Sequence, residues 1–343
     1  MEAEGLLSGL RARAPWRTVA SPLLRSLGFE VGRGYDDTIT ENLASGVTDE
    51  QEEALRLALI EHLVAGEKLI RLVKLKTTEI DKLREWARSK NPVRNALTEA
   101  FPGIAPLGAI RAFDQPEPQY VGAVEVTGGD AALFTSKRSY LERVTLGQDS
   151  LKPTTEHEFE KIIGVRRRFV QTYDAILLPS KGRFACIATD FPDDAPHDFA
   201  EQSQVALEKS MRRVLGEFAA ANLWPAVDGL YSARDGQFVE HGFVTDGESL
   251  KHHKSRRRRK DLREDAFFKG GVKVVGDDLL SYRVGVRWTR RHTPSLDSAP
   301  ELLLPGTSRL LYKANASLEE AIVRGCLNVG DLQFVMSKLA PYL

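Results

Sequence analysis

From Tyr120 onward the sequence contains short segments in which apolar residues recur at every second position, separated by turns rich in glycine and aspartate. A two-residue period places alternate side chains on opposite faces of a strand. Residues 120–126 and 131–134 flank the turn Gly128-Gly129-Asp130, which predicts a hairpin. Further strands are predicted at 169–178, 184–189, 229–233, 238–244, 272–275 and 280–288. Because successive strands form hairpins without helices between them, we expect a mainly antiparallel sheet.

Helical patterns occur on both sides of these strands. Thr48-Asp49-Glu50-Gln51 has the form of a capping box. It opens a helical pattern over 48–89, either one long helix or two in tandem that break near Gly66. The apolar stripe of this helix must be covered, and we expect either the segment 6–27 or a second subunit to cover it. Further helices are predicted at 198–221, 318–324 and 329–339.

These patterns predict an α+β protein with a helical N-terminal arm, followed by a mainly antiparallel twisted sheet with flanking helices. We expect a helical N-terminal region, 1–91, and an α+β domain, 107–343. The 49–88 helix of the first region could mediate a homo-oligomer. Cys186 and Cys326 lie far apart in apolar contexts, which favours a reducing cytoplasm over a disulfide framework. Since no apolar stretch approaches 18 residues, no membrane span is expected.

A concentrated positive charge lies in the loop 251–260. Seven of its ten residues are Lys or Arg, although the chain balances 48 basic against 48 acidic side chains. A neutral chain with one cationic patch should bind polyanions at one face. A solvated loop is the alternative, with its charge partly cancelled by Asp261, Glu264 and Asp265.

The strand at 280–288 extends this cationic patch. Val284, Val286 and Trp288 share the face that we expect to be buried, and Arg283 and Arg287 point the other way. We place Lys273 on the neighbouring strand of the same surface. The full set of candidate phosphate-binding residues is Lys251, Lys254, Arg256, Arg257, Arg258, Arg259, Lys260, Lys273, Arg283, Arg287, Arg290 and Arg291. A second cluster, Arg166-Arg167-Arg168, could pair with Glu156, Glu158 and Glu160 or could contact nucleic acid.

The leading hypothesis is a non-enzymatic nucleic-acid-binding protein, with double-stranded DNA favoured. RNA remains open, but aromatic residues make up only 8% of the chain and no strand carries the aromatic motif that stacks single-stranded bases. No phosphate-binding glycine loop, nucleophile elbow or metal-binding His or Cys motif occurs.

Two alternatives remain. Asp174 and Asp190, with Lys181, could form a divergent Mg²⁺-dependent nuclease site, and this is the one case in which a cofactor is expected. None of the 17 lysines has an acidic residue two positions before it, which argues against the commonest nuclease core. The second alternative is an oligomeric scaffold that binds protein partners.

Overall fold

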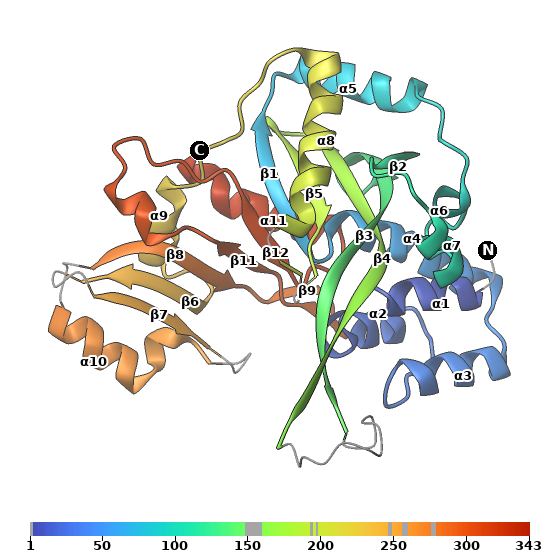
Figure 1. The fold of residues 1–343 in the computed structure, drawn as a ribbon, viewed down its shortest axis with the longest axis horizontal. Helices are drawn as coiled ribbons and strands as arrows, with labels where there is room; N and C mark the ends of the chain where they lie inside the picture. The colour runs from blue at the N-terminus through green and yellow to red at the C-terminus, as the bar shows by residue number, and fades with distance from the viewer. Residues whose placement is uncertain are drawn as a thin grey trace.

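The computed structural model describes residues 3–147, 160–192, 195–196, 198–245, 249–255, 260–275 and 279–343. Among these residues, ten strands form one antiparallel sheet in the order β2-β3-β4-β5-β1-β12-β11-β8-β6-β7, and helices pack on both of its faces (Figure 1). The α+β class is therefore confirmed. The strands of this sheet are β1 (Lys68–Lys74), β2 (Gln119–Val126), β3 (Gly129–Leu146), β4 (Ile162–Pro179), β5 (Phe184–Asp190), β6 (Gln237–Val244), β7 (Leu250–Lys254), β8 (Leu280–Arg287), β11 (Glu301–Leu304) and β12 (Ala321–Arg324).

A separate two-stranded sheet pairs β9 (Arg290–Thr293) with β10 (Leu296–Ser298). The helices are α1 (Ala3–Arg11), α2 (Ser21–Ser26), α3 (Tyr35–Ser45), α4 (Asp49–Ala65), α5 (Thr77–Ser89), α6 (Ala96–Glu99), α7 (Leu107–Ala112), α8 (Asp198–Leu215), α9 (Pro225–Ala233), α10 (Ala266–Val275) and α11 (Val329–Leu339). Short π and 3₁₀ turns are η1 (Trp16–Ala20), η3 (Leu262–Glu264), η4 (Ser308–Tyr312) and η5 (Ala340–Tyr342).

The helical pattern at 48–89 is interrupted by a strand, so the prediction of continuous or tandem helices is wrong there. The capping box at Thr48 is confirmed, but α4 ends at Ala65 and β1 follows before α5 begins. β1 lies between β5 and β12 and is buried on both faces. A strand buried on both faces has a continuous apolar run, whose spacings also fit a helix. The region 1–91 thus contributes a central strand and is not exclusively helical.

Three other predicted elements differ from the structure. Residues 229–233 belong to α9, whose first helical turn carries Pro225. The predicted strand 272–275 lies in α10, and the predicted helix 318–324 contains β12, which pairs with β1 and β11. The two central hairpins, β6, β8 and α11 were predicted correctly within a few residues at each end, apart from longer β3 and β4. The helix predicted at 198–221 begins correctly as α8 but ends at Leu215.

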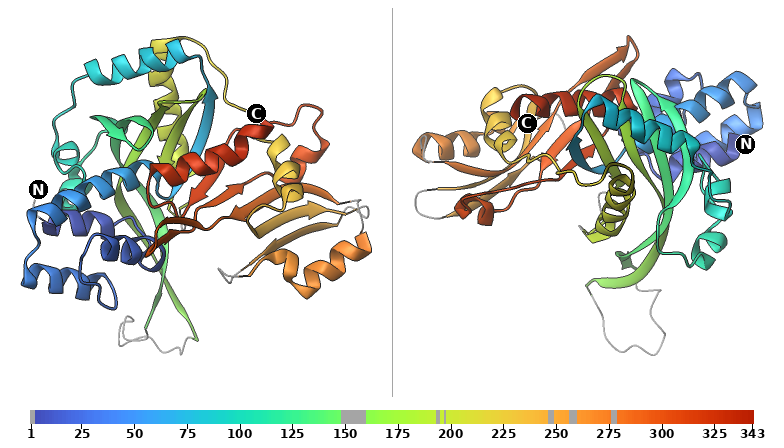
Figure 2. Two further views of the ribbon diagram at one scale, coloured as in Figure 1. Left: turned by 180° about the vertical axis from the view of Figure 1, so that it is seen from behind. Right: turned by 90° about the horizontal axis from the view of Figure 1, so that it is seen from above.

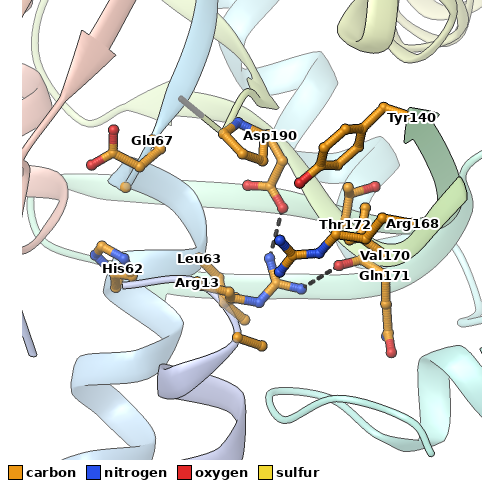
Figure 3. Close-up of a pocket in the computed structure, with 13 residues that line it drawn as sticks. Arg13, His62, Leu63, Glu67, Tyr140, Arg168, Val170, Gln171, Thr172 and Asp190 are labelled. Atoms are coloured by element: carbon orange, nitrogen blue, oxygen red, sulfur yellow. Dashed lines mark hydrogen bonds and ion pairs between the residues drawn. The ribbon is translucent and has the colours of Figure 1, made fainter. Parts of the chain in front are cut away.

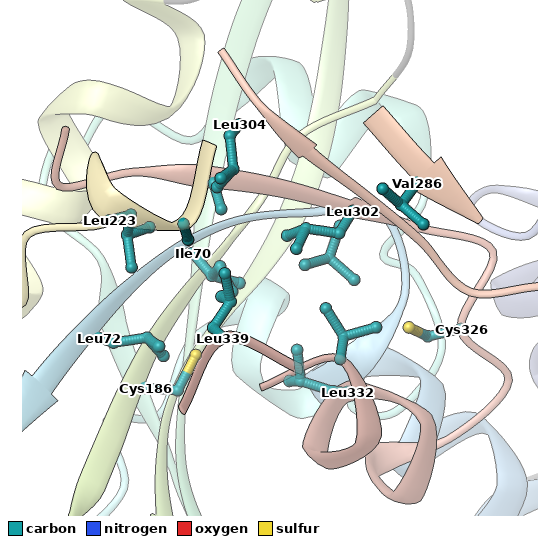
Figure 4. Close-up of a cluster of buried hydrophobic side chains, with 14 of the residues drawn as sticks. Ile70, Leu72, Cys186, Leu223, Val286, Leu302, Leu304, Cys326, Leu332 and Leu339 are labelled. Carbon is teal, nitrogen blue, oxygen red and sulfur yellow. The ribbon is translucent and has the colours of Figure 1, made fainter. Parts of the chain in front are cut away.

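The two faces of the sheet carry separate apolar cores. Ile70 and Leu72 of β1 face α9 and α11, and Figure 4 shows this core with Leu302 and Leu332. Val73, on the opposite face, packs with residues of α5 and α8. Among the described helices, none is long and apolar enough to cross a bilayer.

The apolar stripe of α4 is covered by the N-terminal part of the same chain. Leu55, Leu59 and Leu63 pack with Leu6, Leu10 and other residues of α1 and α2. Figure 2 shows these helices side by side, at the opposite end of the molecule from α10. The sequence left two possibilities for the residues that pack on this stripe, the segment 6–27 or a second subunit. The structure shows the segment of the same chain in this place.

We predict that Leu59→Asp destabilises the protein by more than about 3 kcal/mol, because it buries an unpaired carboxylate where the wild-type side chain is fully enclosed. Leu57→Asp on the exposed side of the same helix is the control and should change stability by less than about 0.5 kcal/mol. Urea unfolding measures both variants. A folded Leu59→Asp protein with a smaller sedimentation mass than wild type would instead identify this stripe as a subunit interface.

Candidate nucleic-acid interface

The edge of the sheet farthest from β2 carries the positive charge recognised in the sequence. β7 is the last strand of the sheet and pairs with β6, while η3 and α10 follow it in the chain. We call β6, β7, β8, η3 and α10 the basic lobe, which forms the left end of Figure 1. Its lysines Lys251, Lys254, Lys260, Lys269 and Lys273 are all exposed. Residues Arg256 to Arg259 lie outside the described residues.

An aromatic cluster fixes α10 beneath the strands. The rings of Phe238, His241, Phe243 and His253 lie within 6.1 Å of one another or of Phe268, which projects from α10. His241 is fully buried and contacts the Ser281 hydroxyl through Nε2 at 3.0 Å. Burial lowers the pKa of His241 to about 3, so this ring is neutral at physiological pH. Between its strands and α10, the basic lobe is therefore packed around a buried, neutral histidine.

On the face of β6 and β7 that points away from α10, the buried carboxylate of Glu240 on β6 contacts several side chains. Glu240 accepts hydrogen bonds from Arg283 and from His252, whose Nε2 lies 3.0 Å away, and Lys254 Nζ lies 3.3 Å from its other oxygen. Burial would raise the pKa of Glu240, but the charge and hydrogen bond of Arg283 outweigh that effect and the net shift is downward. A single anion thus holds several cationic side chains on this face.

The remaining candidate residues lie on α10, β8 and β9, and the arginines on β8 and β9 are ion-paired. Val284, Val286 and Trp288 are buried as predicted. Lys273 lies on α10, so its placement on a neighbouring strand is wrong. Arg287 pairs with Glu301 at 2.5 Å, Arg290 with Asp331 at 2.8 Å and Arg291 with Asp297 at 3.0 Å. These three arginines are already matched by carboxylates and add less net charge than the sequence suggested.

Asp174 and Asp190 meet as predicted, but in a charge cluster that contains different cations. The Asp190 backbone N–H donates to Asp174 Oδ1 at 2.9 Å. Lys68 Nζ lies 2.5 Å from Asp190 Oδ1, and Arg13 Nη1 lies 2.6 Å from Oδ2. Arg138 pairs with Asp174. Lys181 lies in the turn after β4, at the other end of this hairpin, so its grouping with the two aspartates is wrong.

The charges within this cluster compensate one another. Burial would raise the pKa of Asp190, but Lys68 and Arg13 hold it below its ordinary value. Burial lowers the pKa of Lys68, and Asp190 and Asp174 oppose that shift. Since the carboxylates already pair with cations, they offer little to a divalent metal. The described residues contain no group of three or more His, Cys, Asp or Glu side chains that could hold a metal ion.

A pocket of about 140 Å³ opens beside this cluster, lined among others by Arg13, His62, Tyr140, Arg168 and Asp190 (Figure 3). His62 Nδ1 lies 3.1 Å from the carbonyl oxygen of Cys326, which can only accept a hydrogen bond, so Nδ1 carries the proton. Burial, with the charge of Lys68, lowers the pKa of His62 to about 4. Its Nε2 is therefore a neutral acceptor on a ring that lines the pocket.

Sequence reasoning missed Lys68, Arg13 and Arg138, although it found both aspartates. Lys68 opens the apolar run of β1, and a lysine beside a fully buried strand is unusual enough to suggest a buried ion pair. The position of Lys68 suggests an ion pair only after residues 68–74 have been assigned to a buried strand. Arg13 is 177 residues from Asp190 in sequence, and no local pattern connects them.

Comparisons with family models, curated proteins and solved structures gave no match for this chain.

We predict that Lys68→Met destabilises the protein by about 3 to 5 kcal/mol, because it removes one partner of a buried ion pair. Adding Asp190→Asn to that variant should recover part of the loss, since the second charge is then also removed. Lys82→Met at an exposed position is the control. Denaturant unfolding of wild type, of the single variants Lys68→Met and Asp190→Asn, and of the double variant measures the coupling, and purely additive losses would contradict the ion-pair account.

We also predict that stability falls as pH drops from about 6.5 to about 4. An unfolded histidine binds a proton near pH 6.5, whereas folded His62 resists protonation down to about pH 4. His62→Asn keeps a donor for the Cys326 carbonyl, and it should reduce this dependence by up to about 1.4 kcal/mol per pH unit. His252→Asn, at a half-exposed site, is the control. An unchanged slope in His62→Asn would show that this ring is not the titrating group.

Proposed function

We propose that this protein binds nucleic acid, with duplex DNA favoured. The basic lobe would contact the phosphate backbone of the nucleic acid. The observation that carries the proposal is the segregation of charge in a neutral chain. The segment 251–260, whose first four residues belong to β7 and not to the predicted loop, contains seven Lys or Arg residues and no carboxylate. A polyanion releases its condensed counterions when such a cluster binds, which favours association.

The arrangement of the lobe supports this function. Its five described lysines come from β7, α10 and the segment just before η3, and all five are exposed, although Lys254 lies 3.3 Å from Glu240 and Lys260 lies 3.7 Å from Asp265. A groove of about 450 Å³ lies beside His253, Lys254, Lys260 and Asp265. Between Glu248 and Asp277 the sequence contains ten Lys or Arg residues and three carboxylates, Asp261, Glu264 and Asp265, which leaves a local positive excess. The backbone of a duplex requires such a local surface and not a basic protein overall.

The two alternatives draw less support from the described residues. For a nuclease, Asp174 and Asp190 would have to exchange their present cations for Mg²⁺. For a scaffold, the long helix is replaced by α4, β1 and α5, and the stripe of α4 is covered within the chain. The exposed edge of β7 could accept a partner strand, although lysine on an edge strand disfavours such pairing.

The test is to replace Lys251, Lys254 and Arg256 to Arg259 with Gln. We predict weaker binding to duplexes of every sequence, and a plot of log K against log salt that is shallower by about 0.9 for each phosphate that the variant no longer neutralises. The matched control replaces six exposed cations elsewhere, Arg17, Lys82, Arg94, Arg111, Lys209 and Lys313, and should bind like wild type. Mobility shifts at several salt concentrations measure both. Equal affinity of the two variants would refute the proposal, and Mg²⁺-dependent cleavage would favour the nuclease.

A further inference from the structure

The outer halves of β3 and β4 form a two-stranded ribbon that projects from the body of the protein. The two strands pair continuously from Gly129↔Pro179 to Leu146↔Ile162. β2 pairs with β3 only as far as Thr135, and the register of β5 with β4 covers Ala175 to Leu177. Beyond these points β3 and β4 pair as strands only with each other among the described residues, and Figures 1 and 2 show the ribbon extending away from the sheet. Between Leu141 and Leu146 it extends about 17 Å.

One face of this ribbon carries apolar and cationic side chains that are exposed to solvent. Residues directly opposite each other in an antiparallel pair share a face. The pairs Leu141↔Arg167, Arg143↔Val165 and Thr145↔Ile163 therefore lie together, and we call them the outer face. All six side chains are exposed, with Leu141 at 61%, Val165 at 60% and Ile163 at 50%. Closer to the body, the cluster formed by α6 and α7 covers the same face as far as Phe169.

The charge on the outer face limits what can cover it. Arg143 and Arg167 lie among its apolar residues, and these three strand pairs contain no carboxylate. Glu142 belongs to the opposite face, where it pairs with Arg166 at 2.7 Å and Arg168 at 3.2 Å. Between the described residues of two outer faces packed against each other, four arginines would meet without a compensating anion. An occupant must therefore be negatively charged and must also accept apolar side chains.

We propose that the ribbon enters a groove of duplex DNA with its outer face against the nucleic acid. The major groove, about 12 Å wide, admits a two-stranded β-ribbon. Arg143 and Arg167 would contact phosphates, while Leu141, Ile163 and Val165 contact base edges, where thymine methyl groups are apolar. This inference rests on the proposed function and adds a second contact with a different signature. Basic-lobe contacts weaken as salt rises, whereas apolar contacts in a groove depend little on salt.

The decisive variant changes the apolar residues to threonine: Leu141→Thr, Ile163→Thr and Val165→Thr. Threonine keeps the strand propensity, so the ribbon should persist. We expect affinity for a mixed-sequence duplex to fall about tenfold or more at every salt concentration, with an unchanged salt slope. The matched control replaces exposed apolar residues on helices, Leu57→Gln, Leu107→Gln and Val205→Gln, and should bind like wild type.

A cross-linking experiment locates the contact directly. Both native cysteines are fully buried, and burial raises the pKa of each thiol, so a thiol-specific photo-cross-linker should label only an added cysteine. Val165→Cys should cross-link to the duplex, whereas Val205→Cys on α8 should not. Cross-linking at both positions or at neither would overturn the proposal.

The outcomes separate this inference from the function on which it rests. If wild type binds DNA and the basic-lobe variant binds weakly, but the threonine variant binds normally, the groove contact alone is refuted. If wild type does not bind DNA at any salt concentration, both proposals fail. A threonine variant with a smaller sedimentation mass than wild type would identify the ribbon as a contact between copies. If the threonine variant no longer binds anionic lipid vesicles that wild type binds, but still binds DNA normally, the outer face contacts a membrane and not DNA.

Discussion

The ion pair between Lys68 and Asp190 holds the junction where three strands separate. Lys68 begins β1, Asp190 ends β5, and Lys68 also donates to the carbonyl of Tyr173 on β4 at 2.7 Å. The ammonium group of Lys68 is fully enclosed, and its two oxygen partners compensate for the hydration that it loses. Arg13 and Arg138 complete the cluster from α1's C-terminal side and from β3. Apolar side chains could fill the same space but would not fix the direction of each strand so closely.

This junction is also the point at which the ribbon leaves the body of the protein. An isolated two-stranded hairpin is marginally stable in water, so its base has to be fixed by other contacts. Asp174 and Arg138 belong to the ribbon strands, and their pairing ties those strands to the end of β5. On the other face, Gln171 bonds to the backbone of Leu97 and Ala105. The base is thus held from both sides, while the outer face remains uncovered.

Sequence patterns predicted the fold where local signals and tertiary context agreed. The turn glycines defined the hairpins, and alternation assigned Val284, Val286 and Trp288 to the core correctly. The predictions failed for β1 and β12, because short apolar segments buried on both faces have no distinctive period. Both aspartates of the charge cluster were recognised, but Lys68 and Arg13 reach them through contacts that only the folded sheet creates. For the cluster Arg166-Arg167-Arg168, the structure pairs Arg166 and Arg168 with Glu142 and places Arg167 on the outer face. Two of the predicted partners, Glu156 and Glu158, lie outside the described residues.

The exposed apolar residues of the outer face favour aggregation, and the two arginines among them oppose it. Exposed apolar side chains on a two-stranded ribbon are a hazard for aggregation, and charged residues within such a segment reduce that hazard. Arg143 and Arg167 lie among the apolar residues and repel a second copy of the same face. In the proposed complex with DNA the same two charges would attract the phosphates, so one pair of residues would both disfavour self-association and favour the proposed partner. A ribbon required only for folding would need neither the exposed apolar groups nor the arginines, because its base is already fixed by the buried cluster.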